Sequence, residues 1–391
     1  MKILYLVHSI SWVGGGAFFH AFHLAKGMAI LGNDVSIMSI HKKNRFRFVQ
    51  KEYDGITIIE SPDLLRGLAR SGWDLWNTFM RIIFLRKKDF EIVHCLDSRP
   101  AVIFPGLYLK YCRKSKLVIE WLDWFGNGGT ASERKLLLRI FMLPIESFFE
   151  VKFRKYADAS IGLGEPLTAR AKQYTSSDKV ITIVHGCDTT SLKEYDKYWV
   201  REELCLDKNA FIIGYVGRMR DDVILRLTAI VRGLKEKILG KKVYCLLIGN
   251  TAFDYSKYLS KDIEDSFIST GWTEYQKVNM YMSSCDVLTL PFSSRSVARN
   301  GIWPSKVNDY LSVGRPIIST DLLVLRNLFA TNEIGFMVED DLEMLVEKTY
   351  TLLNADELVS KFGKNARLLA ESKLNWKSII QDVHAFYLEI V

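Results

Sequence analysis

Long apolar runs, closely spaced cysteines and proline are all scarce in this chain of 391 residues. No stretch of about 18 residues is apolar and free of charge, so the sequence predicts no transmembrane helix. The opening MKILYLVHSI has one lysine and a short apolar run before a glycine-rich turn, which predicts a first β-strand and not a signal peptide. None of the six cysteines has a partner at CxxC spacing, and most lie in apolar runs, so we expect buried, reduced thiols in the cytoplasm.

The composition is that of a globular protein, with 48% hydrophobic and 25% charged residues. Only 8 prolines and 25 glycines are present, too few for a long low-complexity linker. At roughly 100–200 residues per domain, the length predicts two domains.

Short apolar stretches alternate with helical patterns along the whole chain. KILYLVH, DVSIMSI, ITIIESP, FEIVHCL and KLVIEWLD read as buried strands, and the pattern restarts at AFIIGYVGR after a polar connector. This alternation predicts an α/β protein with two doubly wound parallel sheets. We expect an N-terminal domain over 1–188, a second domain over 189–374 and a terminal amphipathic helix over 375–391.

The whole chain has a net charge of +8, and all of the excess positive charge lies in its first half. Residues 1–190 hold 27 Lys and Arg against 18 Asp and Glu, a balance of +9, and the remaining 26 and 27 give −1. Two stretches, 64–88 and 132–155, mix Arg and Lys with Trp, Phe, Leu and Ile at helical spacing. Such segments fit the surface of an anionic membrane, while ordinary core helices with a solvated basic face are the alternative. No nucleic-acid-binding signature accompanies them, so we expect no nucleic acid partner.

Two turns offer donors for a phosphate group. Gly14, Gly15 and Gly16 follow the first strand, where backbone N–H groups at a helix start favour anions, although a tight turn explains them equally well. Arg218 follows the strand FIIGYVG and could clamp phosphate through its guanidinium, and Arg220 is close by.

The segment WPSKVNDYLSVGRPIIST, residues 303–320, forms a third candidate. Pro304 and Ser305 predict the start of a helix, Gly314 its end, and RPIIST a strand. Lys306 and Asp309 would share one face of that helix, either to hold a diphosphate and a sugar hydroxyl or as a surface ion pair.

Taken in order, these segments resemble the GT-B glycosyltransferases of family 4, which are retaining enzymes that use nucleotide sugars. The motifs that carry the resemblance are LAKGMAILGNDVSI, FEIVHCLDSRPAVI, YADASIGLGEPL, VITIVHGCD, IIGYVGR, STGW, SSCDVLTLPF and PSKVNDYLSVGRPII. The resemblance implies two Rossmann-like domains that face each other across a cleft. It also implies that the first domain binds the acceptor, that the second binds the nucleotide sugar, and that the terminal helix crosses back to the first domain.

The resemblance assigns roles to individual residues. Asp123, Arg218 and Arg220 would be catalytic, with Asp123 near the acceptor and both arginines on the diphosphate. The donor-binding residues would be Gly15, Gly16, Arg218, Asn250, Trp272, Thr273, Asn300, Ser305, Lys306 and Asp309. Asp309 would bond the ribose, and Trp272 and Thr273 would contact the base.

Three positions depart from the family pattern. Gly301 stands where the first carboxylate of an E-x7-E pair is usual, with Asn300 as the nearest polar residue. The lysine that normally follows "GR" by five or six residues is missing, and Leu122 replaces a frequent histidine. These departures leave open a second interpretation, a catalytically degenerate GT-B protein that binds a nucleotide sugar or serves as a scaffold, and a weaker third, a nucleotide-sugar 2-epimerase.

Fixed cations can stabilise a departing diphosphate without a metal ion, and no DxD-type triad is present, so we expect no metal and no cofactor. His20 and His23 alone read as packing residues. The expected partners are a nucleotide-sugar donor, a glycan or lipid-linked acceptor and, through residues 64–88 and 132–155, the cytoplasmic membrane face.

Overall fold

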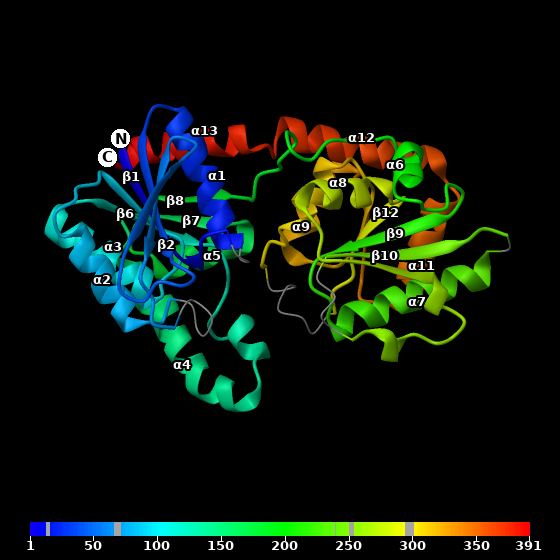
Figure 1. Ribbon diagram of the computed structural model, residues 1–391, viewed down its shortest axis with the longest axis horizontal. Coiled ribbons are helices and arrows are strands. Elements are labelled where there is room, and N and C mark those ends of the chain that lie inside the picture. Colours follow the sequence, from blue (N-terminus) through cyan, green and yellow to red (C-terminus); the bar gives the residue numbers. More distant parts are fainter. Residues whose placement is uncertain (13–15, 66–71, 239, 250–253, 294–300) are drawn as a thin grey trace. The chain divides into compact units, whose positions relative to one another are not determined.

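Parallel strands form two separate sheets, one in each of two units of the chain. The computed structural model describes residues 1–12, 16–65, 72–238, 240–249, 254–293 and 301–391. The first unit consists of residues 1–185, 300–303 and 376–391, and the second of residues 186–299 and 304–375. The predicted α/β class with doubly wound parallel sheets is confirmed (Figure 1).

The first unit contains an eight-stranded sheet in the order β3-β4-β2-β1-β5-β6-β7-β8. Its strands are β1 (Lys2–Ile10), β2 (Asp34–Ile40), β3 (Val49–Tyr53), β4 (Ile56–Ser61), β5 (Ile92–Cys95), β6 (Lys116–Trp121), β7 (Ala159–Leu163) and β8 (Val180–Ile183). Its helices are α1 (Gly16–Ile30), α2 (Leu75–Leu85), α3 (Pro100–Arg113), α4 (Leu136–Lys152), α5 (Glu165–Tyr174) and α13 (Trp376–Ile390), with short 3₁₀ turns at Thr130–Glu133 and Arg154–Tyr156. Among the strands of the described residues in this unit, β3 at the edge alone runs antiparallel, and the sequence pattern did not predict this strand.

The second unit contains a six-stranded sheet in the order β11-β10-β9-β12-β13-β14, parallel throughout. Its strands are β9 (Phe211–Val216), β10 (Val243–Ile248), β11 (Phe267–Gly271), β12 (Val287–Leu290), β13 (Ile317–Thr320) and β14 (Gly335–Val338). Its helices are α6 (Lys197–Glu203), α7 (Asp221–Lys237), α8 (Tyr275–Ser284), α9 (Lys306–Ser312), α10 (Arg326–Asn332), α11 (Leu342–Leu353) and α12 (Asp356–Ser372), with 3₁₀ turns at Ser256–Tyr258, Glu264–Ser266 and Leu323–Leu325. Helix α6 lies inside the segment expected to be only a connector, because Asp196 caps it by accepting the Trp199 N–H.

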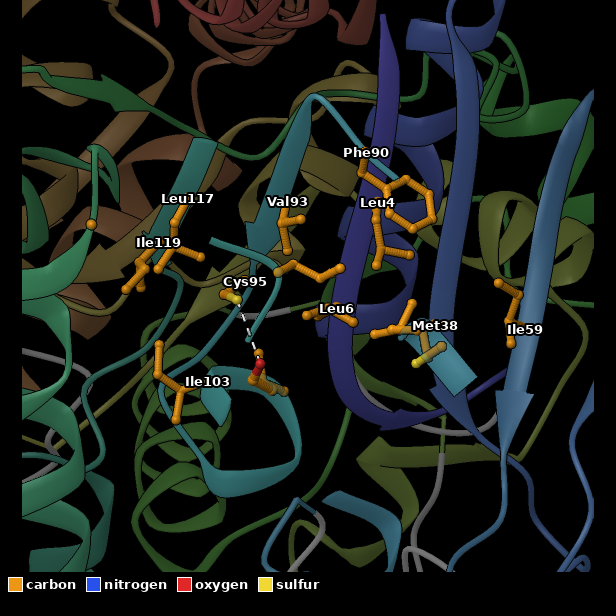
Figure 2. Close-up of a cluster of buried hydrophobic side chains, with 14 residues drawn as sticks. Leu4, Leu6, Met38, Ile59, Phe90, Val93, Cys95, Ile103, Leu117 and Ile119 are labelled. Carbon is orange, nitrogen blue, oxygen red and sulfur yellow. Dashed lines mark hydrogen bonds between the residues drawn. The ribbon is translucent and has the colours of Figure 1, made fainter. Parts of the chain in front are cut away.

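Alternating apolar residues of the first sheet build a buried core against α3. Leu4 and Leu6 of β1, Leu117 and Ile119 of β6 and Ile103 of α3 are all fully buried (Figure 2). Because residues two apart on a strand face the same side, these side chains cover one face of the sheet. Four cysteines, at 95, 187, 245 and 285, are buried as expected, but Cys112 and Cys205 are exposed.

Helix α13 packs on α1 within the first unit. Gly27 of α1 allows this contact, because a Cβ atom there would lie 2.0 Å from Cδ1 of Ile380. None of the helices in the described part of the chain is both long and apolar enough to cross a bilayer.

The order of strands reverses once in each sheet. In the first unit the chain builds outward from β1 toward β4 and then resumes on the other side of β1 at β5. In the second unit the same reversal falls between β9 and β12. In open parallel sheets, ligands bind at the carboxyl ends of the strands that flank such a reversal, so these two edges are the places to look for a site.

Candidate functional site

In the second unit, β9 ends at the reversal in a glycine turn. Gly217 has φ +114°, a conformation that strongly favours glycine, and its N–H donates to the carbonyl of Ile248 on β10. The turn therefore needs glycine for its backbone shape before any ligand is considered.

The ammonium group of Lys306, the first residue of α9, lies directly against this turn. Its Nζ donates to the hydroxyl of Tyr215 at 3.0 Å and lies 4.3 Å from the centre of that ring. The ring of Phe292, which follows β12, is 5.5 Å from the same atom. A Cβ atom added to Gly217 would lie 3.1 Å from Nζ, so a side chain there would press on the ammonium group.

Burial lowers the pKa of Lys306 from its usual 10.5 to about 8. The positive charge of Arg220 lowers the pKa further, and Asp309 opposes the shift. The expected proximity of Lys306 and Asp309 is thus supported, while Tyr215 and Phe292 were not foreseen. A desolvated cation at a strand end is a common mark of a binding site for an anion.

The two arginines beside this lysine differ in exposure. Arg218 is exposed, and its backbone carbonyl accepts a hydrogen bond from the Tyr215 hydroxyl at 3.0 Å. Arg220 is half-buried, and its Nε donates to Asp222 at 3.0 Å. Because Lys306 also donates to the Tyr215 hydroxyl, Tyr215 links the lysine to the backbone of the arginine turn.

The other predicted donor residues lie in differing environments. Ser305 is the N-cap residue of α9, as expected, but its side chain makes no capping hydrogen bond and is exposed. Trp272 is 80% exposed just after β11, with Thr273 next to it. Gly16 begins α1 with open space around its Cα, so its own neighbours do not require a glycine. The predictions for Gly15, Asn250 and Asn300 lie outside the described residues.

In the first unit, polar groups gather at the reversal edge around Asp123, which follows β6. His8 of β1 lies 3.0 Å from a carboxylate oxygen of Asp97, and Nε of Arg99 lies 3.2 Å from the same oxygen. Asp97 and Arg99 follow β5, the strand between β1 and β6. The sequence predicted only Asp123, although the polar residues shortly after the strand FEIVHCL were a signal for Asp97 and Arg99.

Burial raises the pKa of Asp123 from 3.8 to about 7, and Arg99 only partly opposes the shift. Its carboxylate accepts the N–H of Trp124 at 2.8 Å. For Asp97 the balance is reversed: although burial favours its neutral form, Arg99 and His8 lower its pKa to about 2. One carboxyl group that titrates near neutrality therefore stands near one that stays ionised, a pairing suited to proton transfer.

A buried polar network that the sequence did not reveal lies deeper in the first unit. Glu120 contacts His20 at 2.8 Å and His94 at 3.1 Å, and His94 in turn lies 2.6 Å from the hydroxyl of Tyr387 on α13. His20 also lies 2.9 Å from His185, whose pKa burial lowers to about 3. His20 thus belongs to a buried polar network, which is more than the packing role expected for it, and His23 stacks on Trp376. The network ties α1 and α13 to the sheet.

Comparison with known proteins gives the same architecture. Residues 210–355 match the family described as Glycosyl transferases group 1. No curated protein matches the chain. Among solved structures, sucrose-phosphate synthase from Thermosynechococcus elongatus has a TM-score of 0.73 at 15% identity, over 100% of this chain and 99% of that one.

Two further structures are equally similar. WaaG, a glycosyltransferase involved in lipopolysaccharide biosynthesis, has a TM-score of 0.72 at 13% identity, over 97% of this chain and 98% of that one. Anabaena HepE, solved in complex with UDP-glucose, has a TM-score of 0.71 at 15% identity, over all of both chains. The chain therefore has the GT-B fold of two Rossmann-like domains, as the resemblance implied.

Proposed function

We propose that the protein transfers a sugar from a nucleotide-sugar donor to a glycan or lipid-linked acceptor. The observation that carries this proposal is the desolvated ammonium of Lys306 against the Gly217 turn, at the reversal edge of a sheet whose sequence matches glycosyl transferases. The donor diphosphate would meet Lys306, Arg218 and Arg220, and Asp309 would bond the ribose. UDP and UDP-glucose are bound in the Anabaena HepE structures, which supports a nucleotide sugar as the donor class.

The chemistry required at this edge is stabilisation of a leaving group. Breaking a glycosyl–phosphate bond passes through an oxocarbenium-like transition state while negative charge grows on the diphosphate. Cations already fixed by the fold stabilise that charge without rearrangement. Lys306 supplies such a cation, so the absence of the usual lysine after Gly217-Arg218 is compatible with activity. Retention of configuration and independence from metal ions remain parts of this proposal.

The acceptor would bind at the Asp123 edge of the first unit, close to a membrane. Two helices of this unit carry exposed apolar residues, with Leu75, Phe79 and Ile83 on α2 and Leu137, Phe141 and Phe148 among those on α4. Trp73 packs against Phe149 of α4 with ring centres 5.0 Å apart, which brings the two segments together. Of the four aromatic residues in the stretch 64–88, only Phe79 is exposed; Trp73 and Trp76 are half-buried and Phe84 stacks on Phe48. With exposed Lys and Arg nearby, the two helices support docking on the anionic cytoplasmic face of a membrane.

The test is a thermal-shift screen with UDP-, GDP-, ADP- and CMP-sugars, followed by a transfer assay with the sugar nucleotide that stabilises the protein. A bound nucleotide raises the melting temperature by mass action. We expect one nucleotide class to stabilise the wild type and Arg218→Ala to abolish both the shift and the transfer. Unchanged binding and transfer in Arg218→Ala would refute the assignment of Arg218 to the diphosphate. Binding of a nucleotide sugar by the wild type without transfer or hydrolysis would favour the degenerate scaffold. This second candidate is specific because Gly301 replaces the first carboxylate of the E-x7-E pair.

A further inference from the structure

Helix α4 has its apolar and polar faces inverted relative to an ordinary surface helix. Leu137, Ile140, Phe141, Ile145 and Phe148 are between 43% and 73% exposed. At about 100° per residue these five positions share one face of the helix. The side chains turned inward on the opposite face are Met142, Glu146 and Glu150, which are 2–3% exposed.

The inward face of α4 holds the backbone of the loop that follows β6. The carboxylate of Glu150 accepts the N–H groups of Phe125 at 2.9 Å and of Gly126 at 3.1 Å. The hydroxyl of Ser147 accepts the N–H of Asn127 at 2.9 Å. The contact is tight, because a Cβ atom on Gly126 would lie 2.5 Å from Glu150 Oε2 and 3.0 Å from Ser147 Cα. This is the loop that begins at Asp123.

Arg170 of α5 braces the same contact from a second direction. Its Nη2 lies 3.2 Å from Glu150, and its guanidinium lies 4.2 Å from the centre of the Trp124 ring. Trp124 in turn donates its N–H to Asp123. Glu150 is thus connected to the Asp123 loop both through backbone amides and through Arg170.

The first part of α4 has little inside the protein to hold it. Every residue from 136 to 141 is exposed, and Lys135, Arg139, Lys152 and Lys155 are exposed along the same segment. This combination of apolar side chains and cations complements an anionic lipid surface. A bilayer would bury these side chains only when the helix is formed, because only then do they share one face. Figure 1 places α4 at the opposite end of the first unit from α13.

We infer that α4 couples lipid docking to the Asp123 loop: an anionic bilayer that binds its apolar face also stabilises the helix position in which Glu150 and Ser147 hold residues 125–127. This inference rests on the proposed membrane association and adds a regulation of the acceptor edge. A ligand shifts a conformational equilibrium only by its difference in affinity for the two states. Here the difference comes from the apolar face, which lipid contacts only on the ordered helix. Coupling is reciprocal, so weakening the inner contacts must also weaken lipid binding.

The experiment measures hydrogen–deuterium exchange of the Phe125, Gly126 and Asn127 amides in the full chain, with and without vesicles of phosphatidylcholine and phosphatidylglycerol. Flotation of the same samples reports vesicle binding. We expect binding at low salt and exchange at these amides at least about tenfold slower with vesicles. Leu137→Ser with Phe141→Ser should lose both effects. Leu225→Ser with Leu368→Ser changes leucines of the second unit that are equally exposed and should lose neither.

Ser147→Ala separates coupling from docking, because it removes the bond to Asn127 and leaves the outer face intact. We expect faster exchange at Asn127 without lipid and several-fold weaker flotation. Vesicle binding by the wild type with unchanged exchange at residues 125–127 would overturn the coupling and leave membrane docking standing. No flotation at all would overturn the docking as well. Protection that depends on protein concentration and not on lipid would instead assign the face to a second copy of the chain.

Discussion

Replacement of Lys306 by methionine tests whether its ammonium is buried for binding at the expense of stability. Methionine keeps most of the apolar length of the side chain and removes the charge. The pKa of Lys306 falls from 10.5 to about 8 in the folded protein, mainly because of burial. At 1.36 kcal/mol per pKa unit, this shift corresponds to a penalty on the charged form of about 3 kcal/mol.

The size of this penalty on the stability of the folded protein depends on pH. Below about pH 8 the lysine is charged in both the folded and the unfolded chain, so the whole penalty acts on the folded state. Between about pH 8 and 10.5 the folded protein loses the proton first, and the penalty disappears as pH rises. Lys306→Met also loses one hydrogen bond and two ring contacts of the ammonium, together worth about 1 kcal/mol, while the Tyr215 hydroxyl keeps its bond to the Arg218 carbonyl. We therefore expect the variant to be more stable than the wild type by about 2 kcal/mol at pH 7, with the difference shrinking toward pH 10.

The measurement is urea unfolding at pH 7, 8.5 and 10, with nucleotide binding followed in parallel by thermal shift. A charge-assisted hydrogen bond to a phosphate is worth about 1.5–3 kcal/mol, so UDP or the nucleotide selected by the screen should bind Lys306→Met about 10- to 100-fold more weakly. Lys277→Met, at an exposed lysine on α8, is the matched control and should change neither property. A variant that is less stable than the wild type at pH 7, or a stability difference that does not depend on pH, would refute the reasoning.

Three further predictions concern single contacts. Because burial raises the pKa of Asp123 to about 7, folding is accompanied by proton uptake between about pH 4 and 7, and the free energy of unfolding falls as pH rises through this range. Asp123→Asn should flatten this dependence in urea unfolding. The same dependence on pH in the variant and the wild type would contradict the prediction. Gly217→Ala should lower stability by about 1–3 kcal/mol and weaken nucleotide binding, whereas Gly240→Ala, also at positive φ but in open space, should leave binding intact in the same thermal-shift assay. Tyr387→Phe removes the hydroxyl that His94 contacts inside the protein and should lower the free energy of unfolding by about 1–3 kcal/mol, unlike Tyr198→Phe on the surface; equal stabilities would show that the network is not a determinant of folding.

Much of the fold could be read from local patterns because parallel strands buried on both faces are continuous apolar runs. KILYLVH and FIIGYV needed no tertiary information to be recognised. The edge strand β3 was missed because most of its residues are polar and exposed, so no alternation with a buried face is visible. Helix α6 has only seven residues and buries two of them, Val200 and Arg201, which is too short a pattern to show a helical period.

The candidate site was only partly predictable, because strand order decides which residues meet. Lys306 and Asp309 are neighbours on one helix, and their spacing was sufficient to associate them. Tyr215 reaches Lys306 across 91 positions, and His8 reaches Asp97 across 89, because β9 adjoins β12 and β1 adjoins β5. A single sequence contains the residues of such a cluster but not the adjacency of the strands that carry them.

In helices α2 and α4, hydrophobic periodicity correctly predicts a helix, but the apolar stripe faces outward and not toward the core. An apolar stripe ordinarily marks the face that packs on the core. On α2 the buried position is instead held by Arg81, whose guanidinium donates to the Ala101 carbonyl and the Ser61 hydroxyl. On α4 it is held by Glu150, which accepts loop amides. Both side chains pair with buried polar groups that must be hydrogen-bonded once water is excluded, and only polar side chains can do this. Because polar side chains occupy the inner face, the apolar stripe is left on the outer face of each helix. A large apolar face beside exposed cations makes a membrane surface the first partner to test.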